Sequence, residues 1–157
     1  MRIKNKFYDD RIVFKPWGYE YTVYRNLNYL SVTFLKINYK RKTSLHCHPN
    51  KKTGFILLDG KVSIQLGLWK TSTKLYKAPS KLMIRTGLFH SIKAMSKKGA
   101  LILEFETPVN KKDLVRFKDN YGRESKLYEG KKFTKIIDQK IIKFKKPKFG
   151  SNQTYII

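Results

Sequence analysis

The chain has 157 residues, the size of one domain, and 41% of them are hydrophobic, which is enough for one buried core. No stretch approaches the run of about 20 apolar residues that a membrane helix needs, and no apolar segment follows the charged residues 1–6, as it would in a secretory signal. Cys47 is the only cysteine, so an intramolecular disulfide is excluded. We therefore expect a single domain in the cytoplasm.

The charge is strongly positive, with 35 Lys and Arg against 11 Asp and Glu, a formal +24. One interpretation is an anionic partner: a phosphosugar, a sugar nucleotide, an acidic polysaccharide or a nucleic acid. The other is a lysine-rich background that serves solubility, because the lysines are scattered through every segment and only 131–148 is enriched further. No nucleic-acid-binding motif is present, so charge and aromatics alone do not favour that partner.

Between residues 12 and 106 the chain consists of short segments rich in β-branched and aromatic residues, which is typical of strands. The segments that predict strands are 19–24, 30–37, 44–48, 54–58, 62–69, 74–77, 82–85, 91–94 and 100–106. Turn-forming pairs such as Asp59-Gly60 and Thr86-Gly87 separate them. Many short strands without an amphipathic helix among them predict an all-β barrel or sandwich.

The pattern changes after Pro108. Asn110 can cap a short helix, with Asp113 three residues on, and 133–144 predicts one more strand. The end, 145–157, is expected to be loosely held. We therefore divide the chain into N-terminal strands that pack on the barrel (1–29), a barrel core (30–107) and a C-terminal extension with a short helix and a basic tail (108–157).

The chain contains three histidines, and their placement is its strongest functional signal. His46 and His48 lie two apart in a predicted strand, so both project to the same face. His90 follows the Thr86-Gly87 turn, just before another strand. Imidazoles that converge from adjacent strands of a barrel are well suited to bind a metal.

These residues resemble the two motifs of the cupin superfamily. His46, His48 and Gly60 match the first motif, and Gly87 and His90 match the second. The resemblance spans about 30–107 and implies a double-stranded β-helix, or jelly-roll barrel, with the three histidines on one divalent metal. It also implies a homodimer. Residues 15–20 are similar to segments of mannose-6-phosphate isomerase-like cupins, small proteins often associated with surface carbohydrate synthesis.

The sequence departs from the cupin motifs at three positions. Thr53 stands near the expected glutamate, Arg85 replaces the proline of the second motif, and Lys40 stands near an expected glycine. Without the glutamate, the site has three neutral imidazoles. That set suits Zn or Fe(II) better than Mn, with Ni as a further candidate among divalent transition metals.

Glu104 and Glu106 lie on one face of the predicted strand 100–106, opposite three apolar residues. If the apolar side packs outward, the two carboxylates face the barrel mouth, where they could bind the metal or act as the catalytic base. The alternative is that both face solvent and bond to nearby lysines.

Four residues are candidates for contact with substrate. Arg85 lies beside the histidine loop and suits a phosphate or carboxylate, while Trp17 and Tyr19 could stack on a sugar ring. Arg123, with Arg116 and Tyr121, could close over the barrel mouth. Each also has a structural alternative: a surface turn for Arg85, core or dimer packing for the aromatics, and a packing lid for Arg123.

Three functions remain open. The first is a metal-dependent isomerase or epimerase of a phosphorylated or nucleotide-activated sugar, in which a carboxylate or a tyrosine moves the proton. The second is a three-histidine Fe(II) dioxygenase, which Thr53 favours. The third is a non-catalytic module that binds a sugar or polyanion. We favour the first, with a small anionic sugar as partner.

Overall fold

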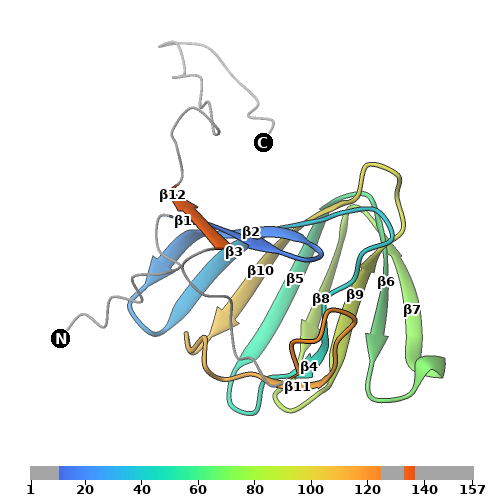
Figure 1. Ribbon diagram of the computed structural model, residues 1–157. Helices are drawn as coiled ribbons and strands as arrows, with labels where there is room; N and C mark the ends of the chain where they lie inside the picture. Colours follow the sequence, from blue (N-terminus) through green and yellow to red (C-terminus); the bar gives the residue numbers. More distant parts are fainter. Residues whose placement is uncertain (1–10, 125–132, 137–157) are drawn as a thin grey trace, which may run out of the picture.

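The computed structural model describes residues 11–124 and 133–136 and shows two antiparallel β-sheets that face each other (Figure 1). The seven-stranded sheet has the order β12-β1-β2-β3-β10-β5-β8, and the five-stranded sheet has the order β11-β4-β9-β6-β7. The strands are β1 (Arg11–Lys15), β2 (Gly18–Asn26), β3 (Leu30–Ile37), β4 (Leu45–Cys47), β5 (Lys52–Asp59), β6 (Lys61–Leu66), β7 (Thr73–Lys77), β8 (Ser80–Ile84), β9 (His90–Ala94), β10 (Ala100–Thr107), β11 (Val115–Lys118) and β12 (Thr134–Ile136).

The apolar core lies between the sheets and follows the period-two alternation of the strands. On β10, Ile102 is 1% exposed and pairs across the sheet with Leu35 of β3 and Leu57 of β5. The facing sheet contributes Ile64 and Ile92, both buried in the same cluster. This packing confirms the predicted all-β barrel.

Two of the turns use the glycines of the sequence motifs. Gly60 has φ +92° and Gly87 has φ +72°, a left-handed region that favours glycine. Lys40, which stands near an expected glycine, also has a left-handed φ of +61°. The backbone geometry of that turn is therefore kept although the residue is not glycine.

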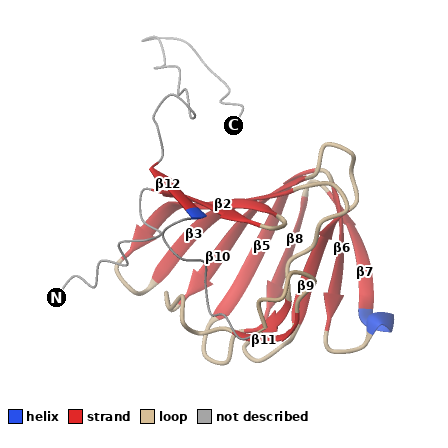
Figure 2. Ribbon diagram, viewed as in Figure 1, coloured by secondary structure: helices blue, strands red, loops and turns tan. Residues whose placement is uncertain are grey.

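The short helix predicted from Asn110 is wrong. Asn110 does accept hydrogen bonds from the backbone N–H groups of Lys112 and Asp113, but the turn stops there. Val115 and Arg116 then pair with β4 as β11, so strand pairing replaces the helix. Helical structure in the described residues is limited to short 3-10 turns such as η1 (Lys70–Ser72) (Figure 2).

The N-terminal strands belong to the same sheet as the barrel strands, because β2 pairs with β3 along its whole length. Thr134–Ile136 pairs with β1, so the predicted strand 133–144 is formed in that part. The remainder of it and the tail 145–157 lie outside the described residues. Among the described residues, no helix is long and apolar enough to span a membrane.

Candidate metal centre

The three histidines come together at one end of the barrel interior. His46 lies on β4 directly opposite His90, the first residue of β9, and His48 follows the end of β4. The ring centroids are 4.5 Å apart for His46 and His90, 5.0 Å for His46 and His48, and 5.4 Å for His48 and His90. One ligand nitrogen from each ring lies within 4.8 Å of the other two. The convergence expected from the sequence is therefore present.

Hydrogen bonds to backbone carbonyls decide which nitrogen of each ring faces the centre. The Nδ1 atom lies 2.8 Å from the Ser44 carbonyl in His46, 2.6 Å from the Asp113 carbonyl in His48 and 3.0 Å from the Leu88 carbonyl in His90. A carbonyl only accepts, so each Nδ1 carries the proton and each Nε2 presents a lone pair. The same arrangement orients imidazoles that bind metals.

Burial keeps the imidazoles neutral. It lowers the pKa of His48 to about 3, with a further contribution from Lys51, and lowers the pKa of His90 to about 4. The pKa of His46 is also well below its usual value, first through burial and then through the two other histidines. Neutral imidazole is the form that binds a metal, so no proton has to be removed at pH 7.

The donor set fits a divalent transition metal. The Nε2 atoms of His48 and His90 are buried and have no hydrogen-bond partner in the described part of the chain. A buried polar atom without a partner is costly, and a bound metal would satisfy it. Thr53, at the position of the missing glutamate, is 1% exposed and offers only a hydroxyl. Three imidazoles would therefore hold the metal, a set that Zn and Fe accept.

Both predicted carboxylates face this cavity. Glu104 and Glu106 of β10 line it, and each places a carboxylate oxygen within 4.8 Å of the ligand nitrogen of His48. Both carboxylates therefore point into the barrel, although the lysine contacts of the alternative are present at Glu106. Their roles differ, because Glu106 accepts hydrogen bonds from Ser31 at 3.1 Å, from Lys111 at 2.8 Å and from Lys51.

The two carboxylates have opposite pKa shifts. Burial, and to a smaller degree the charge of Glu106, raise the pKa of Glu104 to about 8. Burial also acts on Glu106, but the ammonium groups of Lys111 and Lys51 outweigh it and bring the pKa of Glu106 below its usual range. Glu106 is therefore a fixed anion, whereas Glu104 can change its protonation state near neutral pH.

The cavity has a volume of about 100 Å³ and is lined by more cationic groups than carboxylates. Lys15 is paired with Glu20 at 3.3 Å, and Arg123 is paired with Asp119 at 2.8 Å. The charged side chains in the wall are Lys15, Lys51, Lys111, Arg116, Arg123, Glu20, Glu104 and Glu106. Cationic groups still outnumber carboxylates when Asp119, the ion-pair partner of Arg123, is added to the carboxylates.

The residues predicted to contact substrate divide into two pairs. Trp17 and Arg123 line the cavity. Tyr19 does not, because it lies one residue from Glu20 on β2 and packs against Phe14 and Phe34 instead. Arg85 is exposed in the turn after β8 and is also absent from the cavity wall. Geometry therefore gives the substrate roles of Tyr19 and Arg85 no support.

Sequence reasoning missed three functional candidates. Lys51 and Lys111 reach Glu106 inside the barrel, and Asp113 accepts the hydrogen bond of His48. The two lysines give no signal among 35 basic residues. The sequence pattern predicts a helix start at Asp113, and only the pairing of β11 with β4 brings this residue to the site.

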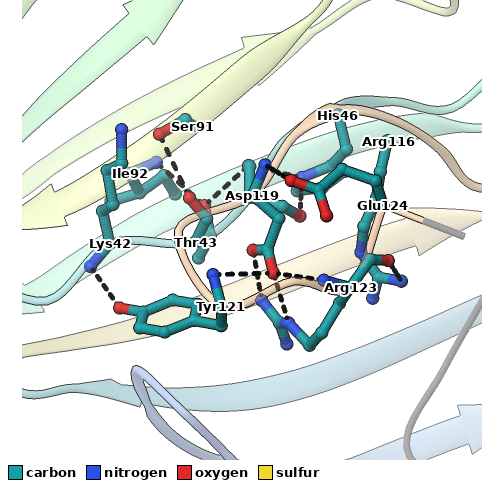
Figure 3. A network of polar contacts seen from close by, with 11 residues as sticks. Lys42, Thr43, His46, Ser91, Ile92, Arg116, Asp119, Tyr121, Arg123 and Glu124 are labelled. Atoms are coloured by element: carbon teal, nitrogen blue, oxygen red, sulfur yellow. Dashed lines mark hydrogen bonds and ion pairs between the residues drawn. The ribbon is translucent and has the colours of Figure 1, made fainter. Parts of the chain in front are cut away.

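The segment 109–124, which we call the strap, covers one side of the centre. Figure 1 shows it in orange beside β4. Figure 3 shows the hydrogen bonds of the strap. The Asp119 carboxylate accepts hydrogen bonds from the Arg123 side chain and from the Tyr121 backbone N–H. The Tyr121 hydroxyl accepts one from the backbone N–H of Lys42, in the loop before β4, at 3.5 Å. Arg116 lies opposite His46 in the strand pairing.

Comparison with known proteins gives structural matches only: no protein-family model matches the sequence, and no curated protein matches it. The cupin domain of Cnp3 from Schizosaccharomyces pombe matches with a TM-score of 0.53 and 12% identity, over 58% of this chain and 64% of that one. KdgF from a Halomonas species matches with a TM-score of 0.57 and 13% identity, over 70% of this chain and 94% of KdgF.

A third match is the capsular polysaccharide assembling protein CapF from Staphylococcus aureus, with a TM-score of 0.59 and 14% identity. It covers 69% of this chain and only 34% of CapF. At identities this low, the structural similarity establishes the fold but not the activity. Taken with the two facing sheets, these matches show that the chain has the double-stranded β-helix fold that cupins share.

Proposed function

We propose that the protein is a metal-dependent cupin that acts on an anionic carbohydrate, as an isomerase or epimerase of a phosphosugar or nucleotide sugar. The observation that carries the proposal is the placement of Glu104. This carboxyl group, with a pKa near 8, shares a cavity with three Nε2 lone pairs, so a proton-moving group lies beside a candidate metal centre.

The charge of the cavity supports an anionic substrate. Five cationic side chains and three carboxylates line it, and Glu104 is largely protonated at pH 7 because its pKa is about 8. The surplus of positive charge lies inside a partly closed space, where electrostatic attraction is less screened than at the surface. A phosphate or carboxylate on the substrate would be drawn to it.

The residues have separable tasks in such a reaction. A bound divalent metal would act as a Lewis acid that polarises a carbonyl or hydroxyl of the sugar. Glu104 takes up or releases the proton at the adjacent carbon, since its pKa lies near neutral pH. Glu106 stays ionised and holds Lys51 and Lys111 in the wall. Trp17 offers an apolar surface to the sugar ring.

The likeness to CapF, a capsular polysaccharide assembling protein, supports a role in surface polysaccharide synthesis. A second candidate function, a three-histidine Fe(II) dioxygenase, is favoured by one observation: Thr53 brings no carboxylate to the centre. The two candidates differ in their metal and in their use of oxygen.

The test is proton exchange at carbon. Metal-loaded protein, purified without a histidine tag, is incubated in D2O with a panel of phosphosugars and nucleotide sugars and followed by NMR. The proposal expects deuterium to enter the substrate next to its carbonyl, and it expects Glu104→Gln to reduce this rate about 100-fold or more. Tyr19→Phe, which lies outside the cavity and packs against Phe14 and Phe34, serves as the control that keeps the exchange.

If the iron-loaded protein consumes oxygen and catalyses no deuterium exchange, the isomerase proposal is wrong and the dioxygenase is supported. Sugar binding that survives mutation of all three histidines, without turnover, would leave a binding module.

A further inference from the structure

Asp113 lies outside the two histidine motifs, and it makes hydrogen bonds to His48 and to the loop after His48 through its backbone and its side chain. Its backbone carbonyl accepts the Nδ1–H of His48 at 2.6 Å. Its carboxylate accepts hydrogen bonds from the next residues after His48 and Pro49: the Asn50 and Lys51 backbone N–H groups donate to Oδ2 at 3.0 and 2.9 Å, and the Asn50 side-chain amide donates to Oδ1 at 2.9 Å. Asp113 is 6% exposed.

The carboxylate fixes where the carbonyl lies. Three donors from the loop 50–51 bind one side chain, so the backbone of Asp113 cannot shift without breaking several hydrogen bonds at once. On its other side, the turn at Asn110 binds the Asp113 N–H, and β11 pairs with β4 two residues later. The position of the His48 acceptor is therefore set by the strap and by the loop that carries Lys51.

His48 depends on this acceptor more than the other ligands depend on theirs. The acceptors of His46 and His90 are carbonyls two residues before them in their own local turns, Ser44 and Leu88. The acceptor of His48 is 65 residues away in the sequence. A change at Asp113 can thus alter His48 while leaving the other two rings oriented.

We propose that Asp113 is a positioning residue that holds His48 in its metal-binding tautomer and orientation, and that it thereby couples the turn 110–113 at the start of the strap to metal affinity. The inference rests on the metal centre of the proposed function, but not on the sugar substrate. Loss of an outer partner of a metal-binding histidine typically weakens metal binding 10- to 100-fold. The same loss lets the proton of a neutral imidazole distribute between both nitrogens.

The experiment compares Asp113→Ala with Asp113→Asn and with Asp119→Ala. Asparagine keeps the shape and one acceptor oxygen, so it should restore part of the effect. Asp119→Ala is the matched control, because Asp119 also accepts hydrogen bonds from the strap backbone and from Arg123 but contacts no histidine. Zn2+ affinity is measured on the full chain by competition with a chromogenic chelator, and tautomers are read from long-range 1H–15N spectra of metal-free protein.

We expect Asp113→Ala to bind Zn2+ 10- to 100-fold more weakly, Asp113→Asn to lie between it and the parent, and Asp119→Ala to stay within about twofold. In the spectra of Asp113→Ala, and to a smaller degree of Asp113→Asn, only His48 should gain the Nε2–H form. A general loosening of the fold would instead affect all three rings.

Parent affinity and an Nδ1–H form of His48 in both Asp113 variants would overturn the proposal. If Asp113→Ala does not fold, the Asp113→Asn comparison decides. Failure of the parent to bind Zn2+ would overturn the metal centre itself and the proposed function with it. Metal binding that depends on Asp113, in a protein without activity on sugars, would overturn the proposed function alone.

Discussion

The two ends of the barrel interior are built by the same strands but from different residues. On β10, inward positions change from Ile102 to Glu104 and Glu106, and on β3 the paired positions change from Leu35 to Thr33 and Ser31. On β9 the change is from Ile92 to His90. All of these residues are shielded from solvent to a large degree, so burial alone does not distinguish the ends.

The two ends of the barrel interior serve different purposes: the apolar end stabilises the fold, and the polar end forms the candidate site. Each apolar side chain that is buried at the apolar end stabilises the folded state. The polar end contains neutral imidazoles and a carboxylate with a raised pKa, which burial disfavours in their charged forms. The polar end should therefore respond to protonation and charge changes, and the apolar end to changes in packing. The following predictions test this division.

The largest expected effect is acid destabilisation of the metal-free protein. His48 and His90 have folded pKa values of about 3 and 4, below the unfolded value near 6.5, so the unfolded chain binds protons first as the pH falls. Their contribution is complete above pH 6.5 and falls by about 1.4 kcal/mol per pH unit per histidine below it. Between pH 6.5 and 5 the two together should cost about 3 kcal/mol of unfolding free energy, because the unfolded imidazoles are already half protonated at pH 6.5.

Urea denaturation across this pH range measures the effect. The control is the double variant His48→Gln and His90→Gln, which has no imidazoles at these positions and should show a much flatter profile. Equal slopes for parent and variant would show that the histidines are not the groups responsible.

The next effect separates the two carboxylates. Glu106→Gln removes the carboxylate that the buried ammonium groups of Lys51 and Lys111 both bind, and it should cost about 3 kcal/mol of unfolding free energy. Glu104→Gln replaces a largely protonated carboxyl by a neutral amide and should cost less than about 1 kcal/mol at pH 7. Urea denaturation of both variants gives the comparison, and equal losses would contradict the assigned roles.

The smallest effect concerns the apolar end. Ile102→Val removes one buried methylene group and should lower the unfolding free energy by about 1 kcal/mol. Zn2+ affinity should stay within about twofold of the parent, because Ile102 does not line the metal cavity. A large loss of Zn2+ affinity in this variant would show that packing at the two ends is coupled.

The sequence predicted those features that local pattern determines. The strand alternation predicted the barrel, and the spacing of His46, His48 and His90 predicted their convergence, because strand pairing places motif residues at one level. The strand alternation also made Glu104 and Glu106 candidates for inward-facing residues. The hydrophobic pattern at 114–117 suited a helix as well as a strand, and pairing with β4 decided for the strand.

Other features depended on long-range contacts that no local pattern records. The ion pair of Lys51 with Glu106 joins positions 55 residues apart, and Asp113 contacts His48 across 65 residues. Trp17 and Tyr19 are also separated by long-range structure, because Trp17 lies in the turn before β2 and lines the cavity, whereas Tyr19 lies within β2 and does not line it.

The most direct measurement of the metal centre is X-ray absorption at the zinc edge of protein loaded with one equivalent of Zn2+. The account predicts one tightly bound ion per chain, with three imidazole nitrogens at about 2.0–2.1 Å. In His90→Ala, one imidazole should be lost from the coordination shell. A parent protein that retains no stoichiometric zinc, or that binds it through fewer than three imidazoles, would contradict the account.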